Sequence, residues 1–279
     1  MSDLLPAWSE PFHDGLRPVE PLAMPDPVTP EWAYGDRSGE GVVVAVIDSG
    51  VEADHPLVGA VSRSIVVERD PDEPDGVRFV ECAPEDLYCH GTACAGIIRE
   101  LAPAAEIWSV RVLGANLKGS GFLFAHGLDW CIDQGVDVVN LSLSTSNDRY
   151  FEAFHDLVDQ AGFAGVLVVS AMNNERKTTI PSEFAGVFSV ACAPGVDRER
   201  IVHNPQAPAE WGAAGIDVEV PWLGGATMRT SGNSFAAPVI AGHLARIRAA
   251  HRAITTWQAK TVLAELAARP GLRNDGCDT

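Results

Sequence analysis

The run Gly41-Val42-Val43-Val44-Ala45-Val46-Ile47 constrains the fold of this chain more than any other stretch. It is apolar throughout and rich in β-branched residues, without the alternation of apolar and polar positions that a half-exposed strand shows. Such a strand is typical of a parallel sheet that is buried on both faces. The run ends in Asp48-Ser49-Gly50, so an acid lies where α/β sheets usually carry their sites. A turn residue is the alternative, because Asp-Ser-Gly is favourable turn chemistry.

The rest of the chain alternates between strand-like and helix-like segments. We predict strands over 64–67, 77–80, 106–112, 136–143, 166–170 and 187–192, and helices over 120–134, 150–161, 236–250 and 256–268. Strands that alternate with helices form parallel βαβ units. The sequence therefore predicts an α/β fold with a central, mostly parallel sheet and helices on both faces.

The chain divides into an arm and one domain. Residues 1–38 are rich in proline and acidic residues, with Trp8, Phe12 and Trp32 interspersed. We expect an arm that lies over the surface and is anchored by these aromatic residues, and the alternative is a disordered tail. Nothing marks a further boundary or an internal repeat, so residues 39–279 are predicted to form a single domain.

The charge of the chain argues against some classes of partner. The formal net charge is −18, and nucleic-acid binding needs clustered Lys and Arg, so no nucleic acid is expected. No apolar run approaches the length of a membrane span, so no membrane is expected either. The N-terminus lacks a basic region followed by an apolar core. We therefore expect a cytoplasmic protein, or a secreted one if a leader has been removed, and the oligomeric state stays open.

The six cysteines predict neither a metal site nor a disulfide framework. They are Cys82, Cys89, Cys94, Cys131, Cys192 and Cys277. Their scatter is unlike a zinc ligand set, and without a visible secretion signal free thiols are the expected state. Cys82 and Cys89 are the only pair suspected of forming a bridge. We expect no metal and no cofactor.

The stretch Ser231-Gly232-Asn233-Ser234-Phe235-Ala236-Ala237-Pro238 contains a candidate nucleophile. Small residues around Ser234 would let a substrate backbone approach closely, and the helix start that follows favours developing negative charge. Pro238 is expected in the first turn, where its missing N–H costs nothing. Serine needs a base, and the base needs an orienting group. An ordinary loop before a core helix is the alternative.

His90-Gly91-Thr92 supplies the candidate base. Small residues beside a histidine at a helix start permit tight packing and leave the imidazole at the helix end. A histidine in an apolar helix is usually a satisfied core residue. Here the turn before His90 and the glycine after it favour a functional role.

These motifs, Asp48-Ser49-Gly50, His90-Gly91-Thr92 and Gly232–Pro238, resemble those of the subtilisin-like serine proteases, the subtilases, in the same order. The resemblance extends over roughly residues 30–268 and implies a subtilisin-like three-layer fold. It also implies that Asp48 orients His90, and that His90 takes a proton from Ser234 and returns it to the leaving amine. Ser234 would attack the scissile carbonyl.

The resemblance also implies an oxyanion hole and a substrate groove. Asn174 stands where the family has an asparagine that donates its side-chain amide to the oxyanion, and the backbone N–H of Ser234 would be the second donor. An edge strand beside the nucleophile would pair with the substrate by β-augmentation, and one residue would lie near the floor of the primary specificity pocket. The residues expected to bind substrate are Leu141, Ser142, Leu143, Ser144 and Thr179.

The sequence departs from the family pattern near the expected cleft. Asn233 stands where the family usually has threonine, which permits activity at a cost in rate. Asn173 and Ser144-Thr145 stand where glycines are common, so their side chains are expected to narrow the cleft. Cys94 resembles the thiol that lies beneath the catalytic histidine in the proteinase-K-like subgroup, which implies a buried sulfur that is not a nucleophile.

No segment before residue 30 resembles the inhibitory prodomain of secreted relatives, so we expect either that it has been removed or that the enzyme folds without one. The helix expected after His90 also lacks the interrupting loop that binds calcium in those relatives. The segment 96–107 passes directly to the next strand, and Arg99 would repel a cation. We therefore expect no tight structural Ca²⁺.

The resemblance implies a serine endopeptidase that acts on a peptide or protein substrate. The crowded cleft and the absence of a visible signal and prodomain favour selective intracellular processing. Two alternatives stay open. One is a peptide ligase or macrocyclase that uses the same acyl-enzyme, and the other is a non-catalytic pseudoprotease that binds peptides.

Overall fold

The computed structural model describes residues 22–206 and 208–268. A nine-stranded sheet forms its middle, in the order β3-β2-β4-β1-β5-β6-β7-β9-β8. Neighbouring strands are parallel from β2 to β9, and only the edge strands β3 and β8 pair antiparallel. The strands are β1 (Val43–Asp48), β2 (Arg63–Arg69), β3 (Val77–Glu81), β4 (Glu106–Arg111), β5 (Val138–Leu141), β6 (Leu167–Ala171), β7 (Phe188–Cys192), β8 (Val202–His203) and β9 (Trp211–Ala213).

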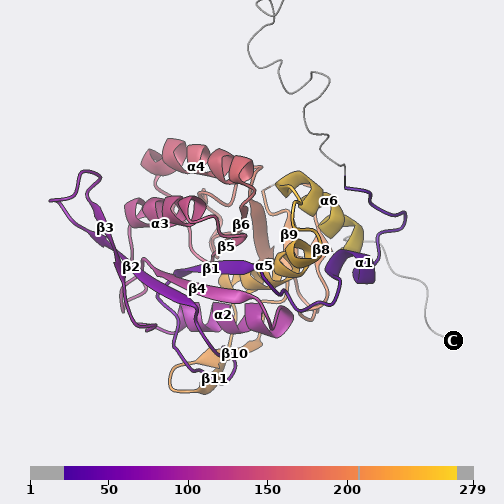
Figure 1. Ribbon diagram of the computed structural model, residues 1–279, viewed down its shortest axis with the longest axis horizontal. Coiled ribbons are helices and arrows are strands. Elements are labelled where there is room, and N and C mark those ends of the chain that lie inside the picture. The colour runs from indigo at the N-terminus through magenta and orange to yellow at the C-terminus, as the bar shows by residue number, and fades with distance from the viewer. Residues whose placement is uncertain (1–21, 207, 269–279) are drawn as a thin grey trace, which may run out of the picture.

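Helices cover both faces of this sheet (Figure 1). They are α1 (Pro30–Tyr34), α2 (His90–Leu101), α3 (Gly121–Asp133), the 3-10 turn η2 (Asp148–Tyr150), α4 (Phe151–Ala164), α5 (Asn233–Ala250) and α6 (Thr256–Leu266). Helices α3 and α4 lie on one side, and α2 and α5 lie on the other. The prediction of an α/β fold with a central, mostly parallel sheet and helices on both faces is confirmed.

Strand β1 shows why the sequence folds into three layers. Its successive side chains point to opposite faces, so an unbroken apolar run serves two cores at once. Val44 and Val46 pack in the core that contains α2 and α5. Ala45 and Ile47 pack in the core that contains α3 and α4. All four side chains are fully buried.

The structure corrects the expected start of the last long helix. Helix α5 begins at Asn233, three residues before the predicted start at Ala236. Pro238 therefore lies inside the helix, and the expectation that it occupies the first turn was wrong. Strand β5 is also shorter than predicted and ends at Leu141.

The sequence reasoning missed several short elements. Helix α1 has five residues, and β8 and β9 have two and three. A separate hairpin joins β10 (Val218–Trp222) to β11 (Ala226–Thr230). These segments are too short or too exposed to give a clear apolar period, because part of each faces solvent.

Trp8 and Phe12 of the predicted arm lie outside the described residues. Trp32 is half-buried, and its ring centroid lies 4.3 Å from that of His251. In the described part of the chain no helix combines the length and the apolar character needed to cross a membrane.

The suspected bridge between Cys82 and Cys89 does not form. The five described cysteines are all free thiols, and Cys277 lies outside the described residues. The Cys82 sulfur contacts the hydroxyl of Ser64 at 3.5 Å. The Cys89 sulfur instead accepts a hydrogen bond from the backbone N–H of Leu223 at 2.8 Å.

Candidate active site

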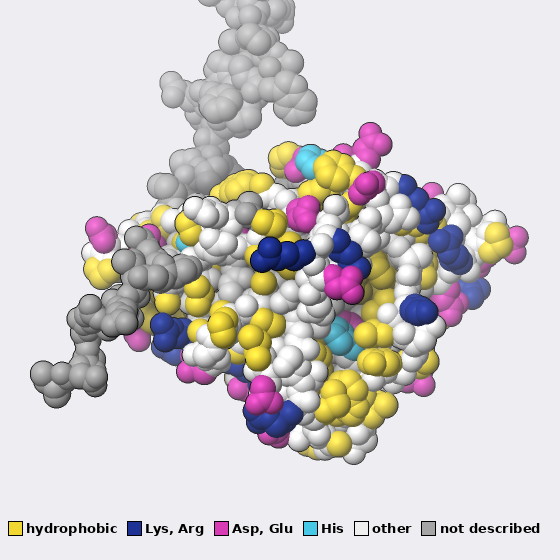
Figure 2. Space-filling view, turned by 180° about the vertical axis from the view of Figure 1, so that it is seen from behind, with side chains coloured by type: hydrophobic (Ala, Val, Ile, Leu, Met, Phe, Trp, Pro, Cys, Tyr) yellow, Lys and Arg dark blue, Asp and Glu magenta, His cyan; other side chains and the backbone are white. Residues whose placement is uncertain are grey.

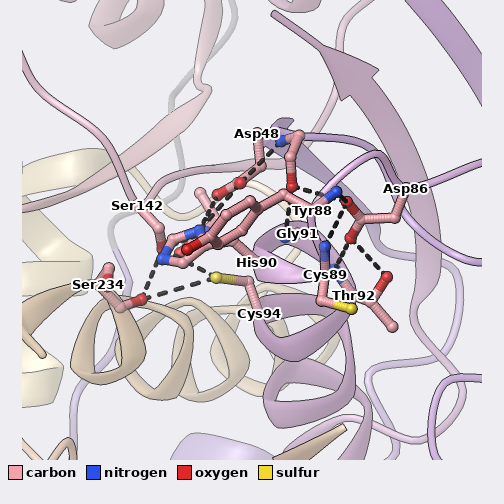
Figure 3. A network of polar contacts seen from close by, with 12 residues as sticks. Asp48, Asp86, Tyr88, Cys89, His90, Gly91, Thr92, Cys94, Ser142 and Ser234 are labelled. Carbon is pink, nitrogen blue, oxygen red and sulfur yellow. Dashed lines mark hydrogen bonds and ion pairs between the residues drawn. The ribbon is translucent and has the colours of Figure 1, made fainter. Parts of the chain in front are cut away.

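Three elements bring Asp48, His90 and Ser234 together (Figure 3). Asp48 is the last residue of β1, His90 is the first residue of α2, and Ser234 is the second residue of α5. The Nδ1 atom of His90 lies 2.9 and 2.8 Å from the two carboxylate oxygens of Asp48. Because a carboxylate only accepts, Nδ1 carries the proton and Nε2 keeps its lone pair when the ring is neutral.

The Asp48 carboxylate sets the basicity of His90. Burial would lower the pKa of His90, but the charge of Asp48 and its hydrogen bond outweigh burial, so the pKa is raised above the ordinary value. Asp48 is fully buried and also accepts a hydrogen bond from the backbone N–H of Ser49 at 2.7 Å. The pair can therefore hold a proton that a nucleophile gives up.

Two glycines allow the end of β1 to touch the start of α2. A Cβ atom on Gly91 would lie 1.9 Å from the backbone oxygen of Gly50 and 3.1 Å from Cβ of Asp48. A Cβ atom on Gly50 would lie 2.0 Å from the backbone oxygen of Glu85, and Gly50 also has a φ of 108°. Larger residues at either position would push His90 away from Asp48.

A buried carboxylate that the sequence reasoning missed holds the first turn of α2. Asp86 accepts hydrogen bonds from the backbone N–H groups of Tyr88, Cys89 and Thr92 at 2.9, 2.8 and 2.8 Å. It also accepts from the hydroxyls of Thr92 at 2.6 Å and Ser49 at 2.8 Å. An acid shortly before a histidine at a predicted helix start was the available signal, since acids favour helix N-termini.

Pro238 changes the hydrogen bonding at the start of α5, the helix that contains Ser234. Proline has no N–H, so the carbonyl of Ser234, one turn earlier, has no helical partner at this position. That carbonyl accepts instead from the hydroxyl of Ser142 at 2.8 Å, and the sulfur of Cys94 lies 3.6 Å from it. The Ser142 hydroxyl also accepts from Asn140 at 2.9 Å. The carbonyl that proline leaves free thus anchors the start of α5 to Ser142, the residue that follows β5.

Cys94 lies directly under the site and is fully buried. Its thiol donates to the Ser142 hydroxyl at 3.2 Å. Burial raises the pKa of Cys94 well above the ordinary thiol value, so the sulfur stays protonated. The thiol is therefore inert as a nucleophile.

Asn174 has an amide that the surrounding structure orients. Its side-chain oxygen accepts from the backbone N–H of Asn233 at 3.0 Å, which leaves its amide nitrogen as the donor. Asn174, His90 and Ser234 line one cavity of about 480 Å³. No hydrogen bond joins His90 to Ser234 in the described structure, as is common before a substrate tightens a site.

The predicted substrate residues divide into two groups. Ser142, Leu143 and Ser144 line the cleft, whereas Leu141 and Thr179 are fully buried and do not. Instead of lining it, Thr179 supports a wall of the cleft. Its hydroxyl donates to the carbonyl of Lys177 at 2.9 Å and accepts from the N–H of Asn173 at 3.4 Å.

The two walls of the cleft continue β5 and β6 and meet at one end. Thr145 and Ile180 exchange two backbone hydrogen bonds of 2.9 Å. Ser144, Thr145 and Asn173 all line the cleft. Lining residues that the sequence reasoning missed are Leu113, Leu117, Lys118, Gly119, Gly121 and Phe124. On the face drawn in Figure 2, acidic and basic side chains are interspersed among hydrophobic and uncharged ones.

One group of side chains in the described structure could hold a metal ion. It consists of Asp48, His90 and Cys94, whose ligand atoms all lie within 4.8 Å of one another. These atoms are the histidine–carboxylate pair and the thiol beneath it. A metal bound there would occupy the base, so it would block the site.

Known proteins resemble the chain over most of its length. The model of the subtilase family matches residues 39–276. The "Thermostable alkaline protease" of Halalkalibacterium halodurans is 31% identical over 235 residues, which are 79% of this chain and 60% of that protein. "Subtilisin BL" of Lederbergia lenta is 29% identical over 248 residues, which are 85% of this chain and 87% of that protein.

A solved structure supports the same fold. It is described as a cold adapted subtilisin-like serine proteinase and superposes with a TM-score of 0.62. The match has 24% sequence identity and covers 81% of this chain and 82% of that chain.

Proposed function

This chain belongs to the subtilase family, and we propose that it is a serine endopeptidase with Asp48, His90 and Ser234 as its catalytic triad. One observation carries the proposal. A buried histidine–carboxylate pair, with Nδ1–O distances of 2.9 and 2.8 Å, shares a cleft with a serine at a helix start and an asparagine amide. This combination provides a base, a nucleophile and an oxyanion donor in one place.

The reaction follows from the protonation states of these groups. Ser234 gives its hydroxyl proton to Nε2 of His90 as Oγ attacks the scissile carbonyl carbon. The oxyanion that forms accepts from the Asn174 amide and from the backbone N–H of Ser234, at the positive end of α5. Asp48 stabilises the imidazolium, which then protonates the leaving amine. Water hydrolyses the acyl-serine by the same route in reverse.

The substrate is an extended peptide, and the cleft accepts it selectively. The segment 142–145 forms one wall, where a peptide can add as a further strand through backbone hydrogen bonds. Ser144, Thr145 and Asn173 line the cleft at positions where the family often has glycine, so their side chains would leave less room for a substrate and favour processing of a restricted set of sequences. The free thiols of the five described cysteines support a reducing, cytoplasmic setting.

Peptide cleavage in H₂¹⁸O tests the activity and separates hydrolysis from ligation. A mixture of unstructured peptides should give fragments whose new C-termini carry ¹⁸O, because water resolves the acyl-enzyme. A ligase or macrocyclase would give joined or cyclic products without the label. Ser234→Ala removes the nucleophile and should abolish cleavage. Label-bearing products from Ser234→Ala at the wild-type rate would refute the triad.

A second variant tests the oxyanion donor. Asn174→Ala should lower kcat far more than it changes KM, because the amide acts mainly in the transition state. The equivalent donor of subtilisin, a member of the same family, gives the scale, a loss of about a hundred- to a thousand-fold. If Asn173→Ala shows this loss and Asn174→Ala does not, the neighbouring amide is the donor.

A further inference from the structure

Asn233 links the nucleophile helix to the loop that carries the oxyanion donor. Its side-chain oxygen accepts from the backbone N–H of Cys192 at 2.9 Å. Its side-chain amide donates to the carbonyls of Met172 and Asn173, both at 3.2 Å. Its backbone N–H donates to the side-chain oxygen of Asn174 at 3.0 Å. One residue therefore touches the loop at three consecutive positions.

These contacts fix both the place and the orientation of the Asn174 amide. The two carbonyl contacts hold the backbone just before Asn174. The backbone N–H of Asn233 engages the oxygen of that amide, so the nitrogen is the atom that remains to donate. The bond to Cys192, at the end of β7, ties the arrangement to the sheet. Asn233 itself does not line the cleft.

We propose that Asn233 is a positioning residue for the oxyanion hole and that it acts through Asn174 without touching the substrate. The inference rests on the proposed function. A primary amide offers two N–H donors and one carbonyl acceptor, and Asn233 uses all three. A hydroxyl has a single donor, so serine or threonine at this position satisfies only one of the two loop carbonyls.

This chemistry gives an expectation that runs against the family pattern. Asn233→Thr introduces the residue that the family usually has, yet it should lower kcat in this chain because the loop loses one anchor. Asn233→Ala should lower kcat further, by about 10- to 100-fold, since displacement of a catalytic group by about 1 Å has effects of that size. KM should change by less than about threefold in both variants, because the affected bond forms in the transition state.

A double-mutant cycle separates positioning from a general loss of structure. If Asn233 acts through the Asn174 amide, Asn233→Ala should have little further effect on kcat once Asn174→Ala has removed that amide. A residue that supports the nucleophile or the overall fold would keep its full effect in both backgrounds.

Asn204 offers a matched control at the far edge of the sheet. Its amide also donates to two backbone carbonyls, those of Gln206 at 2.7 Å and Ala209 at 2.8 Å. Asn204→Ala therefore removes the same kind of contacts away from the cleft. It should leave kcat at the wild-type value, whatever it does to the melting temperature.

The experiment measures kcat and KM on a peptide p-nitroanilide that the wild-type chain cleaves, with thermal unfolding of every variant. The inference predicts the losses above for Asn233→Ala and Asn233→Thr, and their disappearance in the Asn174→Ala background. Wild-type kcat in both Asn233 variants, or an undiminished effect in that background, would overturn it. If Asn233→Ala does not fold, Asn233→Thr and Asn233→Ser complete the same cycle. A wild-type chain that neither cleaves peptides nor reacts with a fluorophosphonate would instead refute the proposed function itself.

Discussion

Replacing Arg99 with methionine should lower the free energy of unfolding by about 2–6 kcal/mol. Arg99 lies near the end of α2, and its guanidinium donates to four backbone carbonyls. These carbonyls belong to Val58 at 2.8 Å, Ala60 at 3.1 Å, Pro103 at 2.9 Å and Ala105 at 2.5 Å. Methionine keeps the apolar stem and removes the donors together with the positive charge.

The magnitude follows from which carbonyls water can reach. Ala60 and Pro103 are exposed, so water can replace the guanidinium there. Val58 and Ala105 are each 1% exposed, so their carbonyls lose their partner without replacement. An unpaired buried acceptor costs about 1–3 kcal/mol, and two of them give the range stated. The loss is a large fraction of the total stability of a domain, which is about 5–15 kcal/mol.

Urea unfolding in the Ser234→Ala background, which prevents self-cleavage, measures this loss. Arg99→Lys is the control, because it keeps the charge but has one nitrogen and cannot reach all four carbonyls. The free energy of unfolding of Arg99→Lys should lie between those of wild type and Arg99→Met. A change below about 0.5 kcal/mol for Arg99→Met, the size of an ordinary surface substitution, would refute the reasoning.

The same geometry bears on calcium. Helix α2 runs without interruption from His90 to Leu101. The Arg99 guanidinium already binds nearby carbonyl oxygens that a metal cation would need as ligands. We therefore expect chelation to leave the melting temperature and the activity nearly unchanged. A fall of many degrees with EDTA, reversed by Ca²⁺ but not by Mg²⁺, would contradict this expectation.

Three further predictions concern titration and thiol chemistry. Because Asp48 raises the pKa of His90, kcat/KM should fall on the acid side with a midpoint above the ordinary value of 6.5, and Asp48→Asn should move the midpoint of the residual activity to lower pH. Burial lowers the pKa of His243 from 6.5 to about 4. The free energy of unfolding should therefore keep its full value above the pKa of the unfolded state and fall as the pH approaches 4, by about 2 kcal/mol near pH 5. If urea unfolding gives the same dependence of this free energy on pH for wild type and His243→Leu, the prediction is wrong. Cys94, fully buried beneath His90, should alkylate slowly in the native chain, while a small mercurial that reaches it should inhibit; rapid alkylation without unfolding would show that the thiol is accessible.

The meeting of Asp48, His90 and Ser234 was predictable because each of them stands in a recognisable local pattern. Asp48 ends an apolar run, and His90 and Ser234 each follow a turn at the start of a helix-like segment. Such patterns depend on neighbours in the sequence, so strand and helix periods reveal them. The common order of the three motifs then indicated that they meet.

The supporting contacts were not predictable, because they join residues that are distant in the sequence. Ser142 reaches the carbonyl of Ser234 only because Pro238 lies inside α5, one turn beyond it. Asp86 accepts hydrogen bonds from two segments that are distant in the sequence. Arg99 donates to carbonyls of one segment that precedes α2 and of another that follows it. Local propensity carries no information on such pairings. The sequence showed Asn233 as a departure from the family pattern, but not that its amide joins the loop at Met172 and Asn173 to the end of β7.

Fluorophosphonate labelling tests the assignment of the nucleophile most directly. The reagent forms a stable adduct only with a serine that a neighbouring base activates. Mass spectrometry of the digested protein should locate one adduct, on Ser234, which Ser234→Ala abolishes and His90→Ala slows strongly. A folded wild-type chain that stays unlabelled, or that carries its adduct on another residue, would contradict the catalytic triad.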